Sequence, residues 1–190
     1  MVTRGGTACG AQLDVFTTPR LRAERLTTAH LPDLRRMDMN PDVMTYLGGL
    51  REEAGTLAYL ERNLFHWSTH GFGLWMLRSV ESGEVVGRAC VRHVTVEVRD
   101  DVEIGYGFLP AYWGQGFATE IAKACVDLAF TQLRCPSVVG LTLPANLGSQ
   151  RVLRKAGLVY DRDVQFDGLP HLLFRRVRAP GVLSVPTVRT

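Results

Sequence analysis

Hydrophobic positions recur along this chain with the two periods that are typical of helices and strands. In "EEAGTLAYLERNLFHWSTHG" the helical period places Leu57, Leu60, Leu64 and Trp67 on one face, and Gly71 is expected to end the helix. Helices are also predicted in "TAHLPDLRRMD", in "NPDVMTYL", after position 116, and from about 149 to 157. The expected caps of the first two are Thr28 and Asn40, the latter followed by Pro41 at the first helical position.

Strands are predicted in seven shorter apolar stretches, which are "LRAERL", "FGLWMLRS", "EVVGRACVRHVTVEV", "DVEIGYGF", "SVVGLTL", "VYDRDVQF" and "LPHLLFRRV". The charged "RDD" is the expected turn between the third and fourth, and "DGLP" the turn between the last two. The order β-α-α-β-β-β-α-β-α-β-β favours an α/β (α+β) fold with one central sheet and helices on its faces. Residues 1–12 and 179–190 have the composition of flexible tails, which leaves residues 13–178 as a single domain.

The composition limits the classes of protein to which the chain could belong. The chain has 190 residues, 46% hydrophobic and 22% charged, as expected for an ordinary globular protein. A net charge of +3 without a basic stripe argues against nucleic-acid binding, and no apolar run approaches the roughly twenty residues that span a bilayer. The N-terminus lacks the apolar core of a secretory signal. The four scattered cysteines, of which Cys90 and Cys125 fall in apolar surroundings, are expected to be free thiols in a reducing cytoplasm.

A glycine-rich turn stands where a strand gives way to a helix. In "FLPAYWGQGFATE" Gly114, Gly116 and Ala118 leave the backbone bare at the start of a helix, where unpaired amides and a positive dipole favour an anion such as a phosphate. Two common nucleotide motifs do not fit, because Thr119 stands where the dinucleotide fingerprint needs glycine or alanine, and Phe117 where the P-loop needs lysine. A turn that binds nothing is the structural alternative.

Together with "VEIGYGF" before it and "ANLGSQRVLRKAGL" after it, this turn resembles the Gcn5-related N-acetyltransferase (GNAT) superfamily. The likeness extends from "TPRLRAERLT" through "NPDVMTYLGG", "GFGLWML" and "SGEVVGR" to "FDGLPHLLF", and is strongest to the RimJ/RimL-like ribosomal-protein N-terminal acetyltransferase branch. It implies a mostly antiparallel GNAT-type sheet, acetyl-CoA as co-substrate, no metal, and, as in many members, a homodimer.

The resemblance also implies which residues hold the co-substrate. Gly116 and Ala118 match the family's phosphate turn, and Trp113 occupies the position of a glutamine or arginine. The amides around the turn would bind the pyrophosphate, and the strand end would pair with the pantetheine arm. The implied binding residues are Phe108, Leu109, Trp113, Gly114, Gln115, Gly116, Phe117, Ala118, Thr119, Asn146, Ser149 and Lys155. For Lys155 the alternative is a solvated surface cation.

Acetyl transfer to an amine needs a base, stabilisation of the oxyanion and an acid for the leaving thiolate. Removing a proton at neutral pH costs roughly 4–5 kcal/mol for a lysine but about 1 for an α-amine. Glu103 is the predicted base, directly or through water, with a cross-strand partner of an arginine as the alternative. Ser149 is the predicted acid, with a helix cap as the alternative. Leu153 stands where many members of the family carry a tyrosine that acts as the general acid. Tyr112 and Tyr160 could replace that tyrosine, but their spacing in the sequence does not indicate it.

The sequence says least about the residues that would bind the acceptor amine. The resemblance places Phe65, Trp67, Phe72 and Trp75 near the acceptor, although such spacing is more typical of core packing. His70, His93 and His171 are expected to lie apart from one another. We therefore predict an acetyl-CoA-dependent N-acetyltransferase acting by direct transfer on a protein N-terminal α-amine or on a small-molecule amine. A non-catalytic CoA-binding sensor or partner-binding module is the alternative.

Overall fold

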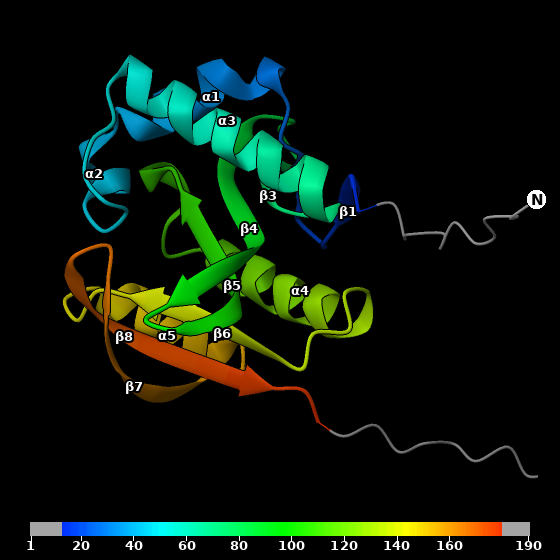
Figure 1. Cartoon of the computed structure of the whole chain (residues 1–190). Coiled ribbons are helices and arrows are strands. Elements are labelled where there is room, and N and C mark those ends of the chain that lie inside the picture. Colours follow the sequence, from blue (N-terminus) through cyan, green and yellow to red (C-terminus); the bar gives the residue numbers. More distant parts are fainter. Residues whose placement is uncertain (1–12, 180–190) are drawn as a thin grey trace, which may run out of the picture.

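The computed structural model describes residues 13–179 and contains one eight-stranded sheet (Figure 1). The tail predicted at 1–12, nearly all of the tail predicted at 179–190, and Cys9 lie outside the described residues. The strands are arranged in the order β1-β2-β3-β4-β5-β6-β8-β7, and every neighbouring pair is antiparallel except β5 and β6. Their bounds are β1 Val15–Thr17, β2 Leu21–Arg25, β3 Leu74–Ser79, β4 Val85–Val96, β5 Arg99–Phe108, β6 Ser137–Thr142, β7 Val159–Phe166 and β8 Leu169–Val177.

The helices are α1 Leu31–Asp38, α2 Pro41–Met44, α3 Glu53–His70, α4 Phe117–Thr131 and α5 Leu147–Lys155, with 3-10 turns at Thr28–His30 and Pro110–Tyr112. The predicted cap Asn40 is confirmed, because its side chain accepts a hydrogen bond from the Val43 amide. Thr28 is not a cap; Thr27 takes that position, and His30 completes the capping box. Within residues 13–179, no helix is both long and apolar enough to cross a membrane.

The mixed fold class is confirmed, but the predicted order of elements needs two corrections. The short strand β1 precedes β2, and the three helices between β2 and β3, each of which the pattern predicts, are counted as two in that order. The "RDD" turn is also wrong. Arg99, Asp100 and Asp101 belong to β5 and pair with β4, and the turn is made by Glu97 and Val98, with Glu97 in the left-handed region at φ 57°. A non-glycine residue at positive φ leaves little signal in sequence.

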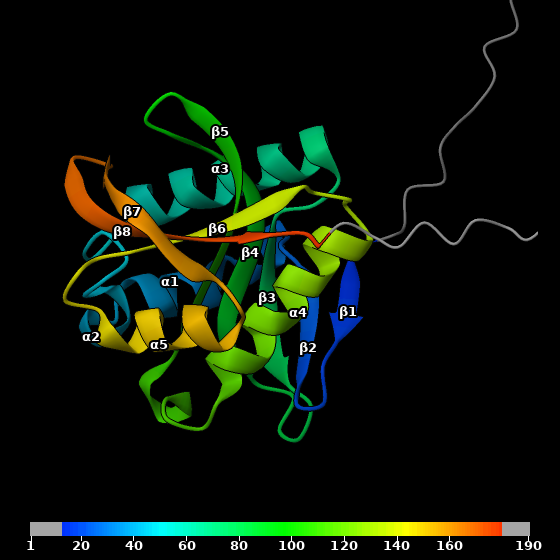
Figure 2. The same ribbon diagram turned by 90° about the horizontal axis from the view of Figure 1, so that it is seen from below.

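Two hydrophobic clusters lie on opposite faces of the sheet. On β3, Leu74 and Met76 pack with α1 and α3, whereas Trp75 and Leu77 pack in the cluster that contains the apolar face of α4. Figures 1 and 2 show α3 and α4 on opposite sides of the central strands. Leu57, predicted on the buried face of α3, is 44% exposed. The alternation of strand side chains therefore places helices on both faces, as the pattern predicts.

The sheet opens between its two parallel strands. β5 and β6 share a single registered pair, Glu103 with Val139. Beyond it, the following residues of β5, up to Phe108, and of β6, up to Thr142, have no registered partner in each other. Both helices that follow these strands, α4 and α5, begin near the open end. In α/β sheets ligands bind outside the carboxyl ends of parallel strands, so this wedge is where a site is expected.

Candidate active site

A groove of about 1090 Å³ follows the wedge and is lined by α2, α3, β4, β5, β6, α5, the β7–β8 hairpin and the turn before α4. The predicted residues that line it are Glu103, Phe108, Trp113, Gly114, Gly116, Phe117, Ala118, Thr119, Asn146, Ser149 and Lys155. Leu109 and Gln115 do not line it. The Leu109 amide donates to the Val86 carbonyl, and the Gln115 side chain donates to the Ala111 carbonyl. The structure thus gathers all but two of the predicted residues in one groove.

The glycine turn has the backbone that its sequence predicts. Gly114 and Gly116 both have positive φ, 73° and 83°, a conformation that other residues adopt at a cost. Gly116 caps α4, and no described residue accepts a hydrogen bond from the amides of residues 114 to 119. Trp113 Nε1 donates to the Phe108 carbonyl at 2.7 Å and so ties the turn to the end of β5. The turn offers unpaired donors at the positive end of a helix.

Arg20 holds this turn in place, a role that the sequence did not reveal. Its guanidinium donates to the Gln115 carbonyl at 2.9 Å and lies 4.2 Å from the centre of the Phe117 ring. Glu120 in the first turn of α4 accepts from Arg20 Nε at 2.7 Å and from Thr18 at 2.6 Å. Arg20 precedes the turn by almost a hundred residues, so only the folded chain brings them together.

Glu103 is buried beside the narrow end of the wedge and is paired with Arg92. The two are registered partners on β4 and β5, and Arg92 Nε donates to the carboxylate at 2.7 Å. The charge of Glu103 raises the pKa of Arg92. The cross-strand arrangement is therefore present, and Glu103 also lines the groove, so the two interpretations of this residue are compatible.

Ser149 is not the cap of α5. Asn146 is the cap, and its side-chain oxygen accepts from the Ser149 amide at 3.0 Å. The Ser149 hydroxyl instead lies 3.1 Å from the hydroxyl of Tyr106 on β5. Burial raises the pKa of Tyr106, so this phenol remains protonated at neutral pH. Tyr106 lines the groove and is a neighbour of Ser149 that sequence reasoning missed, because it lies on another element.

The groove contains one polar side chain that no protein group satisfies. Thr142 Oγ1, at the end of β6, is the one buried side-chain nitrogen or oxygen without a hydrogen-bond partner among the described residues. Thr142 lines the groove and is 4% exposed. A buried hydroxyl without a partner costs free energy, so a ligand that bonds to it would relieve that cost.

Leu153 is core. It is 2% exposed, and a Cβ on Gly140 of β6 would meet its side chain, so the leucine occupies the space that the bare glycine leaves. Of the two tyrosines suggested as substitutes, Tyr112 lines the groove and donates to Glu84, whereas Tyr160 donates to Asp163 on β7.

The aromatic residues predicted near the acceptor do not line the groove. Trp67, Phe72 and Trp75 are buried in the core, and Phe65 is 72% exposed on α3.

The prediction that the histidines lie apart is wrong for His70 and His93, whose ring centres are 4.5 Å apart. His66 joins them. Its Nε2 accepts from the His93 amide at 3.1 Å, and its Nδ1 bonds the Phe72 carbonyl at 2.8 Å. The cluster therefore joins the end of α3 to β4.

The cysteines among the described residues behave as core side chains. Cys90, Cys125 and Cys135 are buried free thiols. Burial raises the pKa of Cys90 to about 11 and raises that of Cys125 as well. Neither is suited to act as a nucleophile at neutral pH.

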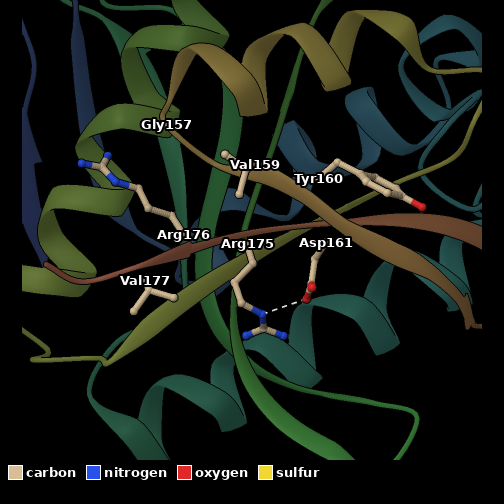
Figure 3. A pocket seen from close by; sticks show the side chains of 7 residues that line it. All are labelled: Gly157, Val159, Tyr160, Asp161, Arg175, Arg176 and Val177. Carbon is tan, nitrogen blue, oxygen red and sulfur yellow. Dashed lines mark hydrogen bonds and ion pairs between the residues drawn. The ribbon is translucent and has the colours of Figure 1, made fainter.

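A second, smaller pocket of about 320 Å³ lies at β7 and β8 (Figure 3). Arg175 dominates it, with ion pairs to Asp161 at 3.0 Å and to Asp101 at 2.6 Å. Arg176 donates to the Ala156 carbonyl. The polar groups of this pocket are bonded within the protein, so the large groove is the better candidate for chemistry.

Comparison with known proteins agrees with this site. The family model for an acetyltransferase (GNAT) domain matches residues 20–159. The chain belongs to the GNAT acetyltransferase family. GNAT domains transfer the acetyl group of acetyl-CoA, and this GNAT chain is accordingly an N-acetyltransferase.

Two relatives and one solved structure show what this chain is similar to. This GNAT chain is 31% identical over 137 residues to the uncharacterized protein YkkB of Bacillus subtilis, covering 72% of this chain and 80% of the relative. It is 30% identical over 152 residues to FsC-acetyl coenzyme A-N(2)-transacetylase of Aspergillus fumigatus, covering 75% and 64%. The structure of an acetyltransferase from Agrobacterium tumefaciens superimposes with a TM-score of 0.78 at 26% identity, covering 92% of this chain and all of the other.

Proposed function

We propose that this GNAT enzyme moves the acetyl group of acetyl-CoA directly to a primary amine inside the groove that opens between β5 and β6. The observation that carries the proposal is the meeting of three features in one groove. These are the turn with unpaired amides, the unregistered edges of two parallel strands, and the buried carboxylate of Glu103 in the one registered pair of those strands. Each serves a different part of the reaction.

The groove has groups that suit each part of acetyl-CoA. Amides from Gly114 to Thr119 would bind the pyrophosphate, because several donors converge at a helix N-terminus. The open edge of β5 up to Phe108 would bond the pantetheine arm and the thioester oxygen, as a further strand bonds a sheet edge. The unpartnered hydroxyl of Thr142 supports a polar ligand here. Lys155 lines the groove and would add a positive charge near the phosphates.

Glu103 would take the proton from the amine, directly or through one water. Arg92 holds its carboxylate in place at 2.7 Å. A carboxylate is a weaker base than an amine. It therefore suits an α-amine, which needs about 1 kcal/mol to deprotonate at neutral pH, better than a lysine side chain.

Ser149 would donate the proton to the leaving thiolate. Its hydroxyl is free for that role because Asn146, and not Ser149, caps the helix. The hydroxyl of Tyr106, 3.1 Å away, holds the serine side chain toward the groove. The three buried thiols support a reducing compartment such as the cytoplasm. Likeness to the ribosomal-protein branch supports a protein N-terminus as the acceptor, with a small-molecule amine as the alternative.

The test measures CoA release from acetyl-CoA with a panel of α-amine peptides and small amines, using wild type and Glu103→Gln. The proposal predicts that Glu103→Gln slows turnover more at low pH than at high pH, where the amine loses its proton unaided. Glu97→Gln on the distant β4–β5 turn is the matched control and should leave the pH profile unchanged. A uniform loss across pH, or none, would contradict the role of Glu103 as the base.

A further inference from the structure

Three arginines gather at the end of the groove formed by α2, α3 and β4. The guanidinium carbons of Arg51, Arg88 and Arg62 lie 4.5, 4.8 and 5.5 Å from the centre of the Tyr59 ring. All four residues line the groove, although Tyr59 itself is buried. A single aromatic side chain thus holds several cations together, and Arg88, Arg92 and Glu103 share one face of the sheet.

The carboxylates nearby do not pair with all of these arginines. Arg51 and Arg88 share one oxygen of the fully buried Asp38, at 2.9 and 2.8 Å. Arg92 is matched by Glu103.

Arg62 forms no ion pair within the described residues, and the remaining acids of the lining, Asp42 and Asp167, pair with none of these arginines. Four arginines therefore stand at this end of the groove, and within the described residues Arg62 is the one without a carboxylate partner.

A guanidinium presents five N–H donors in a planar fork that matches a carboxylate. Arg51 donates to Asp38, to the Leu47 carbonyl and to the Met44 sulfur, which leaves two of its five donors for another partner. Arg51 and Arg62 both contact the Tyr59 ring, so their guanidinium carbons are at most about 10 Å apart, within reach of one small ligand. A polycation would meet repulsion here instead.

On these grounds, and resting on the proposed transferase function, we propose that the acceptor carries a carboxylate close to its reacting amine. The amine binds at Glu103, and the carboxylate is held by Arg62 and Arg51. Such a molecule is either a small amino acid or a peptide with an acidic side chain near its N-terminus. Arg62 is the residue to change, because Arg51 and Arg88 also hold Asp38 and the fold.

The experiment compares kcat/KM for acceptors that differ only in charge: glutamate against its diamide, an acidic tetrapeptide against its Asn/Gln counterpart, and spermidine. Wild type is expected to prefer each carboxylate over its amide by about ten-fold or more. Arg62→Gln should remove that preference by raising KM for the carboxylate, with little effect on the amide. Arg62→Lys should restore part of it, and Lys123→Gln, an exposed cation on α4, should change nothing.

The outcomes separate the proposals. A preference for glutamate identifies a small amino acid, and a preference for the acidic peptide identifies a protein N-terminus; either supports the inference. Equal use of acid and amide, or an equal loss of both in Arg62→Gln, would overturn it while leaving the transferase intact. If none of the amines causes release of CoA, the result would contradict the proposed transferase function, and the inference with it.

Discussion

Asp38 is the residue whose replacement should damage stability most without touching the turn that binds phosphate. It is fully buried at the end of α1 and accepts from Arg51, Arg88 and Thr56, and Arg88 is itself 4% exposed. Asp38→Asn keeps the shape but leaves two guanidinium groups without their shared counter-charge. Breaking a buried ion pair in this way costs about 3–5 kcal/mol.

In a chain of this size each kcal/mol lowers Tm by roughly 2–4 °C, so Tm should fall by roughly 6–20 °C. Calorimetry and urea unfolding measure it. Glu97→Gln is the control, because Glu97 pairs with Arg162 at 3.3 Å while 45% exposed, and such surface pairs contribute roughly 0–1 kcal/mol. A second change, Arg88→Met in the Asp38→Asn background, should recover part of the loss. If Asp38→Asn lowers Tm no more than Glu97→Gln, the arginines are not desolvated and the reasoning is refuted.

Three further predictions concern the turn, the acid and the histidines. Arg20→Gln should raise KM for acetyl-CoA with little change in kcat. An unchanged KM would mean that Arg20 is not needed to hold the glycine turn in place. Ser149→Ala should lower kcat while stability changes by less than about 1 kcal/mol, because Asn146 still caps α5; unchanged turnover would remove Ser149 as the acid. Burial lowers the pKa of His66, so only the unfolded state readily takes up a proton below about pH 6.5. The free energy of unfolding, measured with urea, should therefore be lower at pH 5.5 than at pH 7.5. This difference should be smaller in His66→Gln than in a His171→Gln control, and equal differences in the two variants would contradict the prediction.

Features governed by neighbouring residues could be predicted from the sequence. Asn40 before Pro41, Gly71 in the left-handed conformation at the end of α3, and Gly116 at the start of α4 are local signals, and the structure confirms each. The parallel direction of β5 and β6 also follows from the order of elements, because α4 separates the two strands. Most residues of the groove were predicted because they come from these segments.

Features that depend on distant segments could not be predicted. Arg20 reaches the turn from the β1–β2 connection, and Tyr106 meets Ser149 across two elements. His70 and His93 look isolated in sequence because α3 and β4 bring them together only on folding. The β4–β5 turn was misplaced for a different reason: the charges of "RDD" suggest a loop, yet Asp101 is buried by its pair with Arg175.

The central claim is that the turn at Gly114–Gly116 binds the phosphates of acetyl-CoA, and calorimetric titration tests it most directly. Gly116→Glu places a carboxylate where the pyrophosphate should lie, and Gly83→Glu is its control, because Gly83 has a similar φ of 71° and open space around it in a turn between β3 and β4. The account predicts micromolar binding of acetyl-CoA by wild type and Gly83→Glu, and loss of binding in Gly116→Glu. Equal binding by Gly116→Glu, or none by the wild type, would contradict it.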